Sequence, residues 1–179
     1  MLSKIMIALC TVFRIIPHPP NLAPVGATAV FAGRTLSMRK AILVTFIAMF
    51  IGDFFLAQIH GYSMLSLVTP FVYAGFAAQA FLGRTLRLKN GGLLGAAIGG
   101  ALFFFFISNL GVWLTSGMYA KNLIGLGQCY AAAIPFLGGT LVGDIAWVFI
   151  LNGVYRLLQR VDLPLKGQVP VSTEKLPLY

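Results

Sequence analysis

Charged side chains are scarce in this chain of 179 residues: they make up 9% of it, and only 4 of them are acidic. A soluble domain usually carries roughly 25% charged residues. No polar stretch is long enough to bury a core of its own, which excludes a separate soluble domain. With 59% hydrophobic residues and a mean hydropathy of +0.90, the composition predicts an integral membrane protein.

Cysteine and histidine are also rare. Cys10 and Cys129 lie in apolar surroundings, which favours two packed thiols over a disulfide framework. His18 and His60 fall in different segments and are a poor basis for a metal site, so we expect no bound metal and no cofactor.

Motifs of known catalytic chemistry are missing as well. The chain has no His-Glu-x-x-His sequence, no serine–histidine pair in a supporting context and no glycine-rich phosphate loop. We therefore expect no enzyme and no catalytic residue. Any coupling to ATP must come from partner proteins.

What the chain does have is six apolar segments, a number that suits a compact bundle. The expected helices cover residues 2–16, 21–36, 41–59, 64–83, 91–115 and 130–155. A bilayer-spanning helix needs roughly 20 residues, and the first two segments are shorter. The predicted fold is all-α, a single domain of six transmembrane helices over residues 1–160. Residues 161–179 are expected to form a poorly ordered cytoplasmic tail.

Basic residues alternate between the connections. Of the 13 Lys and Arg residues, all but Arg14 and Lys121 lie near the N-terminus, in the turns at 34–40 and 84–89, or beyond residue 155. Because cytoplasmic loops carry the Lys/Arg excess, both termini are predicted to be cytoplasmic, in a multi-pass protein of the bacterial inner membrane. Topology and lipid contact then explain the net charge of +9, and no nucleic-acid partner is expected.

The stretch Pro17-His18-Pro19-Pro20-Asn21 separates the two short segments. Short or proline-interrupted segments point to binding sites in transporters. Asn21 is predicted to cap the second helix, with Pro24 in its first turn, so that free N–H groups and the helix dipole attract an anion there. Arg14 and His18 could add to that attraction. The alternative is a rigid outer turn that only ties two helices together.

Three polar side chains, Asp53, Asn109 and Asp144, fall within the predicted spans, where an ionisable group is costly and is a functional hypothesis by default. Each has a structural alternative: Asp53 could pair with Arg14 or His60, Asp144 could join an interhelical network, and Asn109 could bond a neighbouring backbone. Trp113 could belong to an interfacial aromatic belt. The candidate ligand site comprises Arg14, His18, Asn21, Asp53, Asn109, Trp113 and Asp144.

Two six-residue stretches, 31–36 and 81–86, are nearly identical and lie at two cytoplasmic helix ends. They suit a parallel repeat of helix pairs; chance or shared helix-end chemistry explains them equally well. Small residues at a spacing of four recur at 95–101 and 139–143 and favour close helix packing, within the chain or against a partner subunit.

Residues 17–21 and 23–27, together with 111–119, 130–136 and Gly143-Asp144, resemble an uncharacterised bacterial membrane-protein family. That family is similar to the substrate-binding S components of energy-coupling-factor (ECF) transporters, and the resemblance runs from Arg14 to about Asn152. It implies a six-helix protein that binds a vitamin or metal ion from outside and docks on a transmembrane coupling subunit driven by ATPases. One departure is that the first helix has only Ala8 where an Ala-x-x-x-Ala face is typical.

The expected function is therefore that of a substrate-binding membrane subunit, which captures a small solute such as a vitamin, a precursor or a metal ion from the outer side for uptake. Its expected partners are the small-molecule ligand, the lipid bilayer and a transmembrane coupling subunit with ATPases. The alternative is a non-transporting assembly protein that packs against a partner through small-residue helix faces. That alternative predicts no cavity of ligand size.

Overall fold

The structure is a computed structural model that describes residues 2–19, 21–61, 63–88 and 91–160. The described residues form an all-α fold with six helices, as predicted. The helices are α1 (Leu2–Ile15), α2 (Val25–Thr35), α3 (Met38–His60), α4 (Thr69–Thr85), α5 (Gly92–Thr115) and α6 (Leu123–Arg160). The expected tail at 161–179 lies outside the described residues.

Three of the helices, α3, α5 and α6, are long and apolar enough to cross a membrane. The other three are shorter than the roughly 20 residues that a span needs, with 14 residues in α1, 11 in α2 and 17 in α4. The prediction of two short helices beside the proline-rich stretch is confirmed by α1 and α2.

Three predicted helix starts were wrong. The second helix begins at Val25 and its N-cap is Pro24, because Asn21 has a left-handed backbone (φ 63°) that cannot enter a helix. The fourth begins at Thr69, where Pro70 occupies the first turn, a position that suits its fixed φ. The sixth begins at Leu123, so Pro135 lies inside the helix and not in its first turns.

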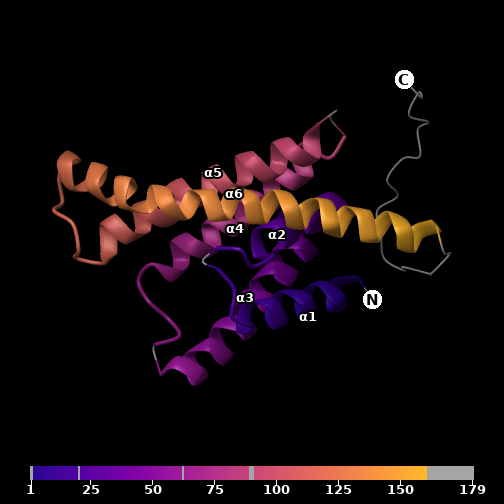
Figure 1. Cartoon of the computed structure of the whole chain (residues 1–179), viewed down its shortest axis with the longest axis horizontal. Coiled ribbons are helices and arrows are strands. Elements are labelled where there is room, and N and C mark those ends of the chain that lie inside the picture. Colours follow the sequence, from indigo (N-terminus) through magenta and orange to yellow (C-terminus); the bar gives the residue numbers. More distant parts are fainter. Residues whose placement is uncertain (1, 20, 62, 89–90, 161–179) are drawn as a thin grey trace.

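The centre of the fold is α2, the shortest helix. It contacts all five other helices, and ten of its eleven residues are buried. In Figure 1, α6 runs along the long axis of the molecule, with α5 beside it and α1 and α3 on the opposite side of α2. The proline-rich loop that precedes α2 is thereby placed close to the middle of the bundle.

The two nearly identical stretches pack against each other where α2 crosses α4. A Cβ atom on Gly33 would overlap the carbonyl oxygen of Ala80, and one on Gly83 would overlap that of Val30. The contact is reciprocal, since each glycine meets the residue three positions before the other. Glycine is required here because only its missing side chain lets the backbones approach so closely.

The ends of α2 and α4 are joined by an arginine. The guanidinium of Arg34 donates hydrogen bonds to the carbonyl oxygens of Leu86 (3.2 Å) and Arg87 (2.9 Å). The basic C-terminal ends of the two helices therefore lie together at the same end of the bundle.

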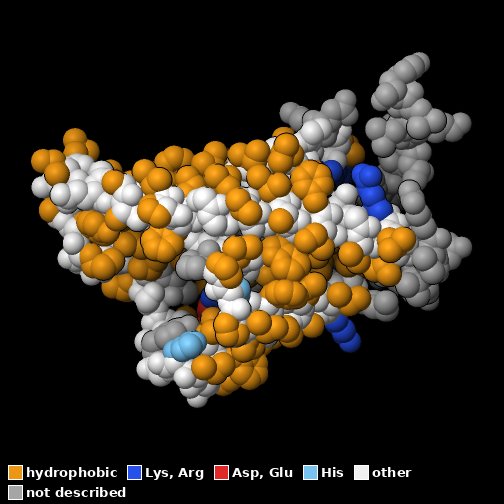
Figure 2. All heavy atoms as spheres, viewed as in Figure 1, with side chains coloured by type: hydrophobic (Ala, Val, Ile, Leu, Met, Phe, Trp, Pro, Cys, Tyr) orange, Lys and Arg blue, Asp and Glu red, His pale blue; other side chains and the backbone are white. Residues whose placement is uncertain are grey.

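The outer surface is strongly apolar. Of the most apolar stretch in α3, α5 and α6, only 33%, 28% and 17% of the residues are buried inside the protein. Figure 2 shows hydrophobic side chains over most of the visible face, with Lys and Arg side chains gathered toward the end that carries the start of α1 and the end of α6. An exposed apolar surface of this kind is typical of contact with a membrane or with another protein.

Candidate functional site

A cavity of about 220 Å³ lies between the helices and the α1–α2 loop. All six helices contribute to its wall. The lining residues are Arg14, His18, Asn21, Ala23, Val25, Gly26, Met49, Leu56, Val72, Phe76, Gln79, Phe104, Thr140 and Asp144. Its volume is slightly below the roughly 300–1,000 Å³ of typical ligand pockets, which limits it to a small solute.

The loop that borders the cavity is fastened to α6. Trp147 donates a hydrogen bond from its indole Nε1 to the carbonyl oxygen of Leu22 (2.8 Å). The side-chain amide of Asn21 donates a second one to the carbonyl oxygen of Phe136 (3.3 Å). A Cβ on Gly143 would lie 3.0 Å from the Asn21 oxygen and 3.2 Å from the Leu22 Cα, so the glycine allows the loop to sit directly on the helix. The order of the loop thus depends on α6.

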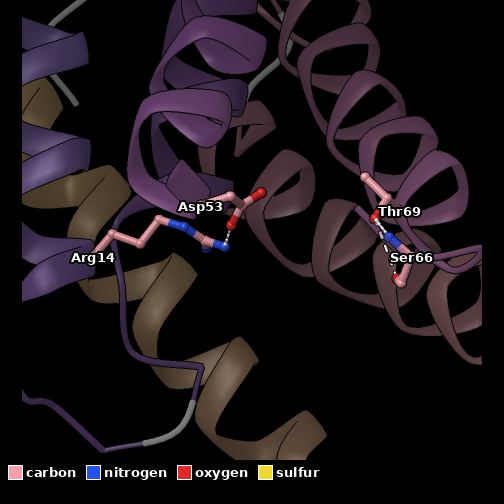
Figure 3. A network of polar contacts seen from close by, with 4 residues as sticks. All are labelled: Arg14, Asp53, Ser66 and Thr69. Atoms are coloured by element: carbon pink, nitrogen blue, oxygen red, sulfur yellow. Dashed lines mark hydrogen bonds and ion pairs between the residues drawn. The ribbon is translucent and has the colours of Figure 1, made fainter. Parts of the chain in front are cut away.

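Arg14 of α1 reaches across to α3 and forms an ion pair with Asp53, as Figure 3 shows. The exposed fractions of the two side chains are 22% and 16%. A Cβ on Gly52 would lie 2.5 Å from the Arg14 Cδ, so this glycine makes room for the arginine. The other pair in Figure 3, Ser66 and Thr69, closes the turn before α4.

This ion pair is one of the alternatives that the sequence left open for Asp53. Asp53 does not line the cavity, but its ion-pair partner Arg14 does. The Nε atom of Arg14 is buried and has no hydrogen-bond partner in the described ranges, so the arginine, which lines the cavity, retains an unused donor.

Asp144 of α6 is placed against the start of α2. It is 3% exposed, and the backbone N–H of Ala27 hydrogen-bonds to it. A Cβ on Gly26 would overlap its carboxylate, so glycine is the residue that admits the side chain. A carboxylate is stabilised at this point by the free N–H groups and the helix dipole.

The expectation that an external anion would occupy the start of the second helix is therefore wrong. The chain's own Asp144 holds that position, and Asn21, the predicted cap, lies too far upstream. The contact joins residues more than a hundred positions apart, which local capping rules cannot anticipate.

Gln79 of α4 is the site residue that sequence analysis missed. It is fully buried (0% exposed), and its Nε2 donates a hydrogen bond to Asp144 Oδ2 at 2.8 Å. Its Oε1 has no partner among the described residues. The signal in the sequence that could have identified Gln79 was a single amide in an otherwise apolar stretch. A polar group in such a stretch is a functional-site hypothesis by default.

Apolar side chains form the remaining wall. The rings of Phe76 and Phe104 lie 4.6 Å apart between centroids at 37°, and Met49 and Leu56 of α3 complete the surface. The cavity therefore combines an apolar wall with a few polar groups, which is the usual composition of a small-molecule site.

A second cavity of about 230 Å³ adjoins the first and shares Asn21, Phe104 and Thr140 with it. Asn109 lines this second cavity, and its amide donates a hydrogen bond to the Phe105 carbonyl of its own helix at 2.8 Å.

Trp113 lies in neither lining. Its indole donates to the carbonyl of Ala120 at 2.9 Å, and the Lys121 ammonium lies 5.6 Å from its ring centroid. Trp113 lies in the last turn of α5, and these contacts join it to the connection between α5 and α6.

Of the seven candidate residues, the first cavity brings together Arg14, His18, Asn21 and Asp144. Within the described ranges, no group of three or more His, Cys, Asp or Glu side chains is placed to hold a metal ion. Cys10 and Cys129 are buried and unbridged, as predicted.

The fold and the site define an all-α protein in which helices of membrane-spanning length surround a small, partly polar cavity beside a proline-rich loop. A sequence profile described as "Family of unknown function (DUF6580)" matches residues 1–166, and the chain belongs to this family. No curated protein and no solved structure matches it.

Proposed function

We propose that this chain is a six-span inner-membrane protein that binds a small solute in the cavity between its helices and captures it from the outer side for uptake. The observation that carries the proposal is the cavity itself, which has contributions from every helix and contains buried polar groups. A protein that only fills space between other subunits has no use for such groups, because burying them costs stability.

The topology is part of the proposal. The six proposed spans include the short helices α1, α2 and α4, each completed by the non-helical residues that adjoin it, and both termini are cytoplasmic. The shared basic end of α2 and α4 supports this orientation, since positive side chains favour the cytoplasmic face. The proline-rich loop then faces outward.

Cysteine labelling tests this topology. In a chain whose two native cysteines are replaced by alanine, Ser63→Cys and Ser116→Cys should react with a membrane-impermeant maleimide added to intact spheroplasts. Ser37→Cys should react only after lysis. All three serines are exposed, so accessibility on the protein does not decide the result. Equal labelling of all three in intact spheroplasts would refute the orientation.

That this chain works as an ECF S component remains a prediction. If it does, a transmembrane coupling subunit with ATPases would supply the energy for uptake. Co-purification of such a subunit with the tagged chain from its native membrane would support this coupling.

The test of solute binding is thermal unfolding of the purified, detergent-solubilised chain against a panel of vitamins, precursors and divalent metals. A ligand of the folded state stabilises it by roughly 2.7 kcal/mol at a hundredfold excess over its dissociation constant. We expect a clear rise in Tm for one chemical class. The rise should be lost in Asn21→Ala and Asp53→Ala and retained in Gln128→Ala, an exposed position outside both cavities.

The competing function is that of an assembly protein which packs against a partner. Among the glycines that would mediate such packing, Gly95 is exposed, whereas Gly99 and Gly139 are half-buried. If a well-folded chain shows no Tm shift across a broad panel, the assembly function is favoured.

A further inference from the structure

We propose that the cavity recognises a small organic cation, such as a protonated amine or amidine, through the Asp144 carboxylate and the free Oε1 of Gln79. This inference rests on the proposed function and names the ligand class of the same cavity. It is argued from hydrogen-bond capacity, charge and the cavity wall.

Hydrogen-bond capacity comes first. Gln79 is fully buried and lines the cavity, and its Nε2 donates to Asp144, which leaves Oε1 as an acceptor without a donor among the described residues. An unsatisfied buried acceptor lowers the stability of the folded protein. A ligand that donates N–H groups removes this cost, whereas a carboxylate cannot, because it has no donor to offer.

Charge gives the second argument. Within the described part of the chain, Asp53 and Asp144 are the carboxylate side chains, and Asp53 is paired with Arg14. The ion pairs of those residues include none for Asp144, whose contacts are Gln79 and the start of α2. A helix terminus offers only partial positive charge, so a ligand cation would complete the neutralisation of the buried carboxylate.

The wall gives the third argument. Phe76 and Phe104 line the same cavity as Asp144, and an aromatic face attracts a cation that has left water. The wall is also apolar enough to hold the carbon skeleton of an amine. Arg14 and His18 stand on the loop side, where they could bond a polar substituent of the ligand.

The probes are benzamidinium, benzamide and benzoate, which have the same shape and differ in charge and donors. Binding to the full chain is measured by ligand-observed NMR at millimolar concentrations. Benzamidinium can donate to a carboxylate through two N–H groups, a geometry that strengthens the pairing. We expect benzamidinium to bind at least about thirtyfold more tightly than benzamide. Benzamide lacks the positive charge, so the buried Asp144 carboxylate would stay unpaired in its complex. Benzoate should not bind.

The decisive variant is Asp144→Asn, which keeps the shape and can still accept from Gln79. It should abolish the preference for benzamidinium over benzamide. Thr45→Val, an isosteric change at a buried position of α3 that lines neither cavity, should retain it. Melting curves of both variants establish that each is folded.

Two results would overturn the assignment of a cation. One is that none of the probes binds, or that benzoate binds best. The other is that Asp144→Asn leaves the preference for benzamidinium unchanged. Neither result decides the proposed function, which the wider solute panel tests. If the panel finds an anionic ligand whose binding is unaffected by Asp144→Asn, the protein binds a solute but the assignment of a cation is wrong.

Discussion

The indole of Trp147 donates its N–H to the backbone carbonyl of Leu22, and this 2.8 Å hydrogen bond fastens the loop beside the cavity to α6. Trp113, the other tryptophan in the chain, makes the same kind of bond to Ala120 but at the connection between α5 and α6. Substitution of each tryptophan in turn therefore tests whether the Trp147 hydrogen bond holds the loop.

The change Trp147→Phe should loosen the α1–α2 loop. It removes one partly buried hydrogen bond, worth about 0.5–1.5 kcal/mol, and leaves the Leu22 carbonyl without its donor. Faster amide hydrogen exchange is expected in the peptide covering residues 16–24. Trp113→Phe should speed exchange at 116–122 and leave the loop unchanged. Equal exchange of the loop in wild type and Trp147→Phe would show that other contacts hold it.

Substitution of Gly83 by alanine should destabilise the protein strongly. The new Cβ would overlap the carbonyl oxygen of Val30, which is backbone and cannot move aside without shifting α2. Overpacking of this kind costs about 1–3 kcal/mol or more. The measurement is Tm in detergent by circular dichroism.

The control for this change is Gly153→Ala on α6, where a Cβ would meet open space and Tm should hold or rise slightly. Gly33→Ala should act like Gly83→Ala, and the double variant should cost less than the sum, because both glycines serve one crossing. A normal Tm for Gly83→Ala would contradict the close approach of α2 and α4.

Breaking the ion pair between Arg14 and Asp53 should cost more than removing both charges. The pair is partly buried, so its loss lies between the 0–1 kcal/mol of exposed pairs and the 3–5 kcal/mol of buried ones, at about 1–3 kcal/mol. Tm values for Arg14→Gln, Asp53→Asn and the double variant form a thermodynamic cycle. Strict additivity of the two single effects would argue against the pair.

The thiols of Cys10 and Cys129 should resist alkylation in the folded protein. Their residues are 1% and 2% exposed, and Cys10 donates to the Thr28 hydroxyl at 2.9 Å. Mass spectrometry after N-ethylmaleimide should find little modification in mild detergent and full modification after denaturation in SDS. Rapid labelling of Cys10 under native conditions would mean that α1 does not stay packed on α2.

Hydrophobic runs and prolines sufficed to predict the number of helices and the two short ones, because these signals are local. The start of α2 was missed because Asn21 carries the usual signature of a cap, yet the prolines around it and its own left-handed backbone delay the helix to Val25. Helix α6 starts earlier than predicted, since Gly125 and Gly127 in its first turns weaken the helical signal there.

The candidate site was predicted in part for a related reason. Rare charged residues in apolar surroundings are conspicuous, so Arg14, Asp53 and Asp144 were found. What Asp144 does depends on Gly26 and Gln79, which come from other helices. The role of Gly26 is visible only once the helices are packed, because an absent side chain leaves no chemical mark in the sequence.

The shared wall of the cavity has a consequence for how the protein is made. Because α6 supplies Thr140 and Asp144 and also fastens the loop, the cavity is not complete until α6 has left the ribosome. A nascent chain that ends after α5 lacks the carboxylate at the start of α2 and leaves the loop unfastened. The order of synthesis therefore forms the helices around the cavity first and its closing wall last.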